Sequence, residues 1–213
     1  MIALQWAEWE PTYTRILHDF GYDRKADEQA RDLLSQLCER SPRVDLVALR
    51  DAIRGREVVI AGPTPTQVSP ADRVLLATDA ATWALADAIA IVTDLDGDVQ
   101  AQLAANARGV PAFVHAHGDN VPALRRWVPL MRGPAQPTTQ AAPVDGVANY
   151  GGFTDGDRAC CIAVELGAAS LALAGFDFDE PAAKHGRDPA VKRRKLAWAR
   201  RIIDGLGVPV RLL

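Results

Sequence analysis

Two carboxylates, Asp94 and Asp96, follow an apolar run and are the residues of this chain best suited to bind a metal ion. The run, Ala88 to Val92, has the length and composition of a buried strand. Side chains two residues apart in an extended chain point to the same side, so the two carboxylates can converge. Converging carboxylates repel each other unless a cation or a proton lies between them. The stretch therefore fits a Mg²⁺ site, although an acidic turn ending at Gly97 is an equal alternative.

Similar polar clusters follow other apolar runs that we predict to be strands. The predicted strands are residues 57–61, 73–77, 89–92, 111–114, 145–148 and 170–174. Helix-like segments separate most of them, and strands that alternate with helices form a mostly parallel sheet. Because ligands bind outside the carboxyl ends of such strands, we expect the clusters to build one site. The clusters contain Gly62, Thr64, Asp79, His115, His117, Asp119, Asn120, Asn149 and Asp177.

The predicted fold class is α/β, with a doubly wound, mostly parallel, Rossmann-like sheet flanked by helices. Residues 1–55 read as an N-terminal helical segment, and residues 56–213 read as the α/β catalytic domain. Aromatic residues recur at helical spacing in the first segment, at Trp6, Trp9 and Tyr13. We expect this face to dock onto the next domain or onto a second subunit, which makes a homodimer one of the predictions.

Composition argues against several classes of partner. The net charge of −3 and the pI of about 5.8 give no case for nucleic acid or for an anionic membrane. No stretch has the length and apolar character of a bilayer span, and the first residues do not form a signal peptide. The three cysteines are odd in number and two are adjacent, which fits a reducing cytosol rather than a disulfide framework. We therefore expect a cytoplasmic protein.

A glycine-rich stretch from Gly151 to Arg158 precedes a predicted helix. Backbone N–H groups at a helix start can hold phosphate. Thr154 and Asp157 also fit a capping box, which needs no ligand. A cap alone requires neither three glycines nor an arginine, so we favour phosphate binding.

Residues His115–Asn120 form a histidine cluster with the spacing of zinc hydrolases that carry His-x-His-x-Asp-His. In this chain Asn120 stands where the third histidine would be, and only His185 remains downstream. We therefore predict that His115 and His117 make polar contacts to substrate or phosphate rather than ligate zinc.

Two other charged features have more than one interpretation. Asp177 can accept hydrogen bonds from a pair of N–H groups on a ligand, or it can act as a helix cap or turn residue. The basic run Lys192 to Lys195 is typical of a solvated helix face, with contact to a triphosphate as the alternative.

Arg158, the paired aspartates and the glycine-rich helix start together suggest a nucleoside triphosphate with Mg²⁺. Neither a P-loop nor a Gly-x-Gly-x-x-Gly fingerprint is present.

An ordered set of these motifs resembles the archaeal 6-hydroxymethyl-7,8-dihydropterin pyrophosphokinase family over nearly the whole chain. That family acts in tetrahydromethanopterin and archaeal folate biosynthesis, and its fold is related to the catalytic domain of thiamin pyrophosphokinase, with an Asp-x-Asp magnesium site. Two departures are Ala80, where the family tends to carry glycine, and Thr64, where it commonly carries serine. The matching stretches are Thr93–Gly97, His115–Asn120, Thr138–Gln140, Asn149–Arg158 and Gly175–Phe178.

The resemblance implies transfer of a diphosphate from ATP to the pterin hydroxymethyl group, with release of AMP and with Mg²⁺ as cofactor. The metal ligands it suggests are Asp79, Asp94, Asp96 and Asp155, with Arg158 neutralising charge on the transferred group. Candidates for ATP phosphates are Gly62, Thr64, Gly151, Gly152, Thr154 and Lys195. Candidates for substrate contact are His115, His117, Asp119, Asn120, Asn149, Phe153 and Asp177, and the general base is either in the histidine cluster or Asp155.

Two other functions compete with this interpretation. The stretch Asp94 to Gly97 also resembles the nucleophile loop of haloacid-dehalogenase-type phosphatases, but Asp98 follows where threonine or valine is usual. A nucleotide-binding regulatory module would use the same loops for ATP and the aromatic N-terminal helices for a partner.

The segment 133–143 is long and polar, which makes it a candidate lid.

Overall fold

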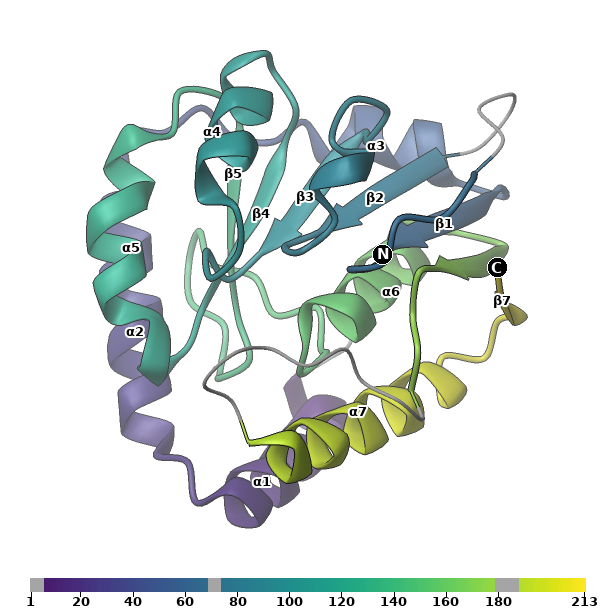
Figure 1. Ribbon diagram of the computed structural model, residues 1–213. Helices are drawn as coiled ribbons and strands as arrows, with labels where there is room; N and C mark the ends of the chain where they lie inside the picture. Colours follow the sequence, from purple (N-terminus) through teal and green to yellow (C-terminus); the bar gives the residue numbers. More distant parts are fainter. Residues whose placement is uncertain (1–5, 69–73, 179–187) are drawn as a thin grey trace.

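The structure, a computed structural model, describes residues 6–68, 74–178 and 188–213. Within these residues a seven-stranded sheet has the order β5-β4-β3-β2-β1-β6-β7, and every neighbouring pair is parallel (Figure 1). This arrangement confirms the predicted α/β class. The strands are β1 Glu57–Ala61, β2 Val74–Thr78, β3 Ala90–Thr93, β4 Ala112–Ala116, β5 Ala135–Thr139, β6 Ser170–Ala174 and β7 Val210–Leu212.

Helices flank the sheet and begin where the sequence supplies caps. Asp23, Asp45, Asp98 and Asp188 each accept a backbone N–H in the first turn of the helix that follows. The α-helices are α1 Trp6–Phe20, α2 Arg24–Leu37, α3 Leu46–Ile53, α4 Val99–Ala107, α5 Val121–Trp127, α6 Asp155–Glu165 and α7 Pro189–Asp204. Short 3-10 helices are η1 Thr82–Ala84, η2 Gly118–Asn120 and η3 Val128–Leu130.

The core has two layers because successive strand residues face opposite sides of the sheet. In β1, Val59 and Ala61 join the layer that packs against α2, α4 and α5. Val58 and Ile60 join the opposite layer, which contains residues of α3, α6 and α7. Since both faces are covered, the strands read as continuous apolar runs, and this is why most of them could be predicted.

Strand order reverses beside β1, because the chain runs outward from β1 to β5 and then returns to place β6 on the other side of β1. Parallel pairing brings the carboxyl ends of β1 to β4 and β6 to the same edge of the sheet (Figure 1). The loops after these strands can therefore meet at this edge, which is where open α/β sheets bind ligands.

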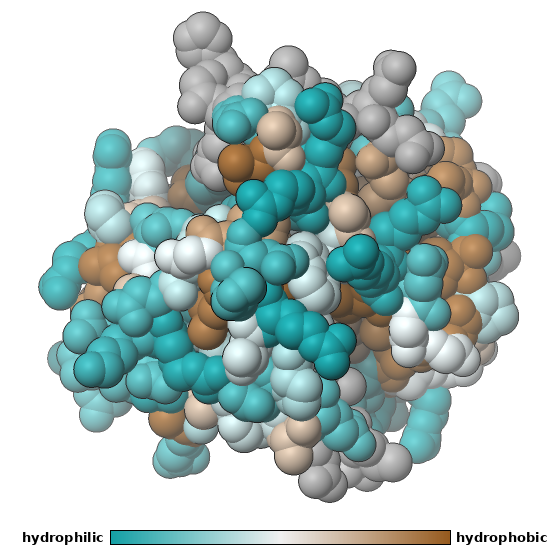
Figure 2. Space-filling model, turned by 90° about the horizontal axis from the view of Figure 1, so that it is seen from below, coloured by the Kyte–Doolittle hydropathy of each residue, from teal (hydrophilic) through white to brown (hydrophobic). Residues whose placement is uncertain are grey.

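The aromatic face of α1 packs inside the chain. Trp9 and Tyr13 are buried in a cluster with Phe153, and Trp198 of α7 packs against the same cluster. Of the two alternatives, the structure therefore bears out docking onto the rest of the chain. The aromatic face of α1 no longer supports the prediction of a homodimer. Figure 2 views the molecule from the side where α1 and α7 lie in Figure 1, and hydrophilic and apolar side chains are intermixed there.

The edge strand β5 differs from the prediction. The sequence predicts a loop and a candidate lid at residues 133–143, but Ala135–Thr139 pairs with β4, and Thr138, Thr139 and Gln140 are buried. The strand predicted at residues 145–148 is not a strand of the sheet and makes only isolated bridges. The segment Ala-Gln-Pro-Thr-Thr lacks the apolar signal of a strand, and proline is tolerated there because β5 lies at the edge of the sheet.

The remaining predicted strands match β1 to β4 and β6, with residue 73 outside the described residues. All three cysteines are free and buried, in keeping with a packing role. Among the described helices, none combines the length and the apolar composition needed to cross a membrane. The boundary at residue 55 stays a prediction.

Candidate functional site

Three carboxylates meet at the edge of the sheet where the parallel strands have their C-terminal ends. Asp79 follows β2, Asp94 follows β3, and Asp155 is the first residue of α6. One oxygen from each lies within 4.8 Å of the others. Residues 76 positions apart in the sequence are brought together because the β2 and β3 ends are neighbours and α6 begins beside them.

The orientation of Asp79 is fixed by a buried network. Thr93 Oγ1 donates to Asp79 Oδ1 at 2.5 Å, and Gln102 Nε2 donates to the same oxygen at 3.0 Å and to the Asp79 carbonyl at 2.9 Å. The other oxygen, Oδ2, is buried and has no hydrogen-bond partner among the described residues. Gly97 lies so close that a Cβ there would come within 2.2 Å of Oδ2. One carboxylate oxygen is thus held by the protein, and the other is left for a ligand.

Burial, together with mutual repulsion, raises the pKa values of two carboxyls in this cluster. Burial, and then the charge of Asp94, raise the pKa of Asp79 to about 6, against the opposing hydrogen bonds from Thr93 and Gln102. Burial and the charge of Asp94 also raise the pKa of Asp155 well above its usual range, and Arg158 opposes this shift. Ionisation of both carboxyls is therefore harder here than in water, and a nearby positive charge would favour it.

The donor set fits Mg²⁺. Magnesium binds carboxylate oxygens at about 2.1 Å in an octahedron, so ligand oxygens around it lie about 3 to 4 Å apart. The three oxygens within 4.8 Å of one another need only a small adjustment to reach that spacing. Asp79 has a buried oxygen without a hydrogen-bond partner among the described residues, and burial and repulsion raise the carboxyl pKa values. A bound cation would relieve both of these costs. All three donors are oxygens, which suits a hard cation better than zinc.

Asp96 lies outside this group. It is exposed, although its charge still contributes to the raised pKa values of Asp79 and Asp155. Leu95, between the two aspartates, is buried and has a φ of 66°, a left-handed conformation that is rare for leucine. The chain is therefore not extended here, and the argument that Asp94 and Asp96 share one side of a strand does not hold. Metal binding by Asp96 stays a prediction.

The glycine-rich stretch forms the entry to α6. Gly151 and Gly152 have φ values of 77° and 87°, and a Cβ on Gly152 would come within 2.4 Å of Arg158 Cα. The predicted capping box is present: Asp157 accepts the backbone N–H groups of Phe153 at 2.6 Å and Thr154 at 2.8 Å. The tight turn places the first turn of α6, with Asp155, against the ends of β2 and β3.

Arg158 is a buried cation beside the carboxylates. Its Nη1 donates to Asp155 Oδ1 at 2.8 Å, and its Nη2 donates to the Phe153 carbonyl at 3.2 Å. Its Nε is buried without a hydrogen-bond partner among the described residues. The side chain thus adds positive charge and a spare donor to a site that is otherwise acidic.

Two residues of the histidine cluster bind the Asp94 loop. His117 Nδ1 accepts the Asp119 N–H at 3.3 Å, which places the proton of the neutral ring on Nε2, 3.4 Å from Asp94 Oδ2. Asn120 Nδ2 donates to the carbonyls of Asp94 at 2.9 Å and His115 at 2.7 Å. Asp119 itself is exposed. The cluster therefore connects the ends of β3 and β4.

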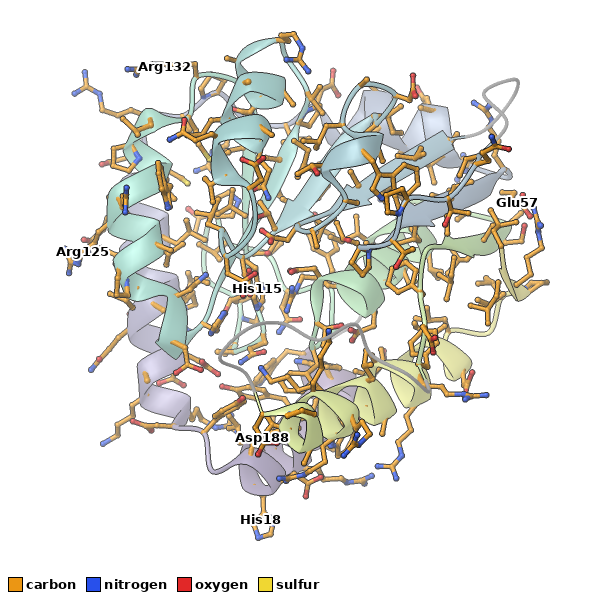
Figure 3. All side chains as sticks on the ribbon, in the orientation of Figure 1. His18, Glu57, His115, Arg125, Arg132 and Asp188 are labelled. Carbon is orange, nitrogen blue, oxygen red and sulfur yellow. The ribbon has the colours of Figure 1, made fainter. Side chains whose placement is uncertain are left out.

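His115 is buried in the interior, whereas His18 projects outward from α1 (Figure 3). Thr138 Oγ1 donates to the Val114 carbonyl at 3.1 Å, so His115 Nδ1 must donate to Thr138 at 3.1 Å. Its Nε2 is then an acceptor, buried without a hydrogen-bond partner among the described residues. Burial and the nearby charge of Arg158 lower the pKa of His115 well below its usual value, so the ring is neutral. His185 lies outside the described residues.

Gly62, Thr64 and Lys195 contact other parts of the chain. Gly62 and Thr64 donate their N–H groups to the Ala174 and Gly175 carbonyls at 2.7 and 3.3 Å, so these groups are already engaged. Lys195 Nζ lies 5.4 Å from the centre of the Phe153 ring, a geometry that allows a cation–π contact.

Asn149 and Asp177 lie in different surroundings. The side-chain amide of Asn149 is engaged by backbone groups of Gln140, Ala141 and Gly151. Asp177 is exposed and lines a cavity of about 380 Å³ between β6, β7 and α7, together with Phe176 and Phe178. The roles predicted for all of these residues stay predictions.

Two residues that hold the centre in place were not among the sequence candidates. Thr93 and Gln102 fix Asp79 through hydrogen bonds, and both are buried. The sequence signal for Gln102 is its spacing of three residues from both Val99 and Ala105, which puts all three on the side of α4 that the structure buries.

Replacing Asp79 with asparagine is expected to stabilise the metal-free protein. The amide can keep the Oδ1 contacts and replace Oδ2 by a donor that faces the other carboxylates. Because the folded carboxyl binds its proton more tightly than the unfolded one, Asp79 favours folding below about pH 4, and this contribution is lost as pH rises through about 6. Urea unfolding in EDTA should show Asp79→Asn more stable than wild type at pH 7.5, by up to about 3 kcal/mol.

The gain should fall below about 1 kcal/mol at pH 4. Added Mg²⁺ should stabilise wild type but not the variant. Asp51→Asn on the exposed side of α3 is the control for loss of one charge and should change neither result. An equal difference between Asp79→Asn and wild type at both pH values would contradict the assignment.

Comparison with known proteins gives no matching family model. Three curated archaeal proteins are similar over nearly the whole chain, and each is named 6-hydroxymethyl-7,8-dihydropterin pyrophosphokinase. The protein from Methanothermobacter thermautotrophicus is 39% identical, over 94% of this chain and 93% of its own. The protein from Methanocaldococcus jannaschii is 33% identical over 93% and 94%, and that from Pyrococcus furiosus is 35% identical over 95% and 94%. With this identity over almost all of both sequences, the chain belongs to the 6-hydroxymethyl-7,8-dihydropterin pyrophosphokinase family.

Proposed function

We propose that this protein transfers a diphosphate from ATP to the hydroxymethyl group of 6-hydroxymethyl-7,8-dihydropterin and releases AMP. The observation that carries the proposal is the meeting of Asp79, Asp94 and Asp155 beside the buried Arg158, in a chain whose relatives bear that name. Transfer of a phosphoryl or diphosphoryl group depends mainly on positioning and on neutralising charge. Three convergent carboxylates with one arginine match that requirement.

The three carboxylates would hold Mg²⁺, which when bound supplies positive charge to the phosphate oxygens. In the reaction, the pterin hydroxyl oxygen forms a bond to the β-phosphorus and gives its proton to the general base, which is either in the histidine cluster or Asp155. The bond from the β-phosphorus to the oxygen that bridges to the α-phosphorus breaks, and AMP leaves with that oxygen. Arg158 is held by Asp155 and the Phe153 carbonyl, so its Nε can be directed at the transferred group.

The pterin is assigned to the side of the site formed by α6 and β6. Phe176 packs between Gly62 and Gly156, since a Cβ on either glycine would come within 2.9 Å of its ring. The ring also lines the cavity that contains Asp177, so this cavity begins one ring away from the first turn of α6. A volume of about 380 Å³ suits a small bicyclic ligand, and Asp177 can accept hydrogen bonds from its N–H groups.

Incubation of the purified protein with ATP, Mg²⁺ and 6-hydroxymethyl-7,8-dihydropterin tests the proposal. Nucleotide chromatography should show AMP and pterin diphosphate appearing in equal amounts. ADP or free phosphate without a pterin product would contradict it and would favour the phosphatase alternative. Bound ATP without any turnover would favour the regulatory-module alternative. The cytoplasmic location and the homodimer remain predictions that this assay does not address.

A further inference from the structure

Asp27 is a buried carboxylate that lies outside the metal-binding cluster. It belongs to the start of α2 and is 3% exposed. Its Oδ1 accepts the Gly118 backbone N–H at 2.8 Å, and its Oδ2 accepts Tyr13 Oη–H and Gln140 Nε2–H, both at 2.8 Å. All three donors are neutral, and no ion pair of Asp27 is found among the described residues. A carboxylate is the one short side chain that can accept all three bonds, because it has acceptors only.

The first of these bonds leads to Asp94. Gly118 follows His117, whose Nε2 lies 3.4 Å from Asp94 Oδ2. The same short segment ends at Asn120, which donates to the Asp94 carbonyl. Gly118 also packs closely on α2, since a Cβ there would come within 2.7 Å of Ala26 Cβ. The position of α2 therefore determines the position of the loop that contacts Asp94.

The hydrogen bond from Gln140 connects Asp27 to the loop that carries Asp155 and Arg158. The carbonyl of Gln140 accepts Asn149 Nδ2–H at 3.1 Å, and Asn149 Oδ1 accepts the Gly151 N–H at 2.7 Å. Gly151 precedes Gly152, which packs directly against the backbone of Arg158. The loop that starts α6 is thus connected to the same carboxylate as the loop after β4.

We infer that Asp27 is a positioning residue that holds the two loops on either side of the carboxylate cluster in register with each other. Its effect on turnover rests on the proposed function, whereas its effect on the two loops does not. A displacement of about 1 Å at a reacting centre can lower a rate about a hundredfold. Loss of Asp27 therefore slows the transfer step without removing any group that touches a substrate.

The test compares Asp27→Asn with Asn106→Ala. Asparagine keeps the size of the side chain but loses at least one acceptor, so it breaks the link to Gly118 or to Gln140. With either link broken, neither loop is held against the other. Asn106 is the matched control, because it is also buried and also makes three bonds to backbone groups, at the opposite end of the sheet. Both variants should lower the melting temperature. Asp27→Asn alone should lower kcat, by about 10- to 100-fold, with KM for both substrates changed less than threefold.

Hydrogen exchange of the same variants gives a readout that needs no activity. In Asp27→Asn, amides of residues 115–120 and of residues 140–152 should both exchange about tenfold faster than in wild type. In Asn106→Ala these two segments should keep wild-type rates. Faster exchange in only one segment, or equal changes in both variants, would overturn the coupling. A wild-type protein that transfers no diphosphate would refute the proposed function, while the exchange result would still decide the role of Asp27.

A second pair of variants covers the case in which Asp27→Asn does not fold. Gly118→Ala should displace the loop through the contact with Ala26 and lower kcat, although Asp27 is intact. Ala26→Gly in the same chain removes the opposing methyl group and should restore most of the lost kcat. Failure of this double variant to recover would overturn the inference that α2 sets the position of the loop.

Discussion

Replacing Asp94 with asparagine should lower kcat for diphosphate transfer about a thousandfold or more. Asp94 is the member of the cluster whose charge raises the pKa values of both Asp79 and Asp155, so it lies close to both. The amide keeps the size of the side chain but removes one of the charges that would hold a cation. The protein should stay folded, because loss of one of three like charges relieves repulsion and the side chain is only partly buried, with 22% exposed.

The measurement is AMP formation at saturating ATP and pterin, with a melting curve of the same preparation. Asp98→Asn is the matched control, since it removes a charge four residues along the same loop, and asparagine caps a helix as well as aspartate does. Its kcat should stay within about threefold of wild type. Asp94→Asn activity within tenfold of wild type, in a folded protein, would contradict the assignment of Asp94.

The sequence was informative wherever function coincided with ordinary α/β packing. Strands β1 to β4 and β6 are buried on both faces and therefore appear as apolar runs. Once the strands are known to be parallel, their carboxyl ends share one edge, and that alone predicts that Asp79 and Asp94 lie near each other. The capping box at Thr154 is similarly local, which explains why the start of α6 and the place of Asp155 could also be predicted.

The features that could not be predicted depend on tertiary contacts. The strand β5 contains proline and threonine and is stabilised by pairing with β4, which no local pattern reveals. Leu95 adopts a positive φ that leucine rarely takes, so the chain between Asp94 and Asp96 is not extended as the sequence argument assumed. Asp27 lies in a helix start, where an aspartate is unremarkable by sequence. Its three donors come from positions 13, 118 and 140, and only the folded chain brings them together.

Replacing Gly152 with alanine should destabilise the protein by about 3 kcal/mol or more and should also abolish activity. The residue has a φ of 87°, which costs an alanine about 1 to 2 kcal/mol on its own. The added Cβ would in addition come within 2.4 Å of Arg158 Cα and 2.7 Å of its nitrogen, so the first turn of α6 must move. Such a movement displaces Asp155 and Arg158 together.

Gly109→Ala separates the two contributions. Gly109 has a φ of 100°, but a Cβ there would meet no atom within 4 Å, so the variant carries the backbone strain without the collision. Its loss of stability should be about 1 to 2 kcal/mol, and its kcat should be that of wild type. Urea unfolding and AMP formation measured on both variants test the argument. Equal losses of stability would mean that strain alone explains Gly152, and an active Gly152→Ala would mean that the start of α6 can move without disturbing the reaction.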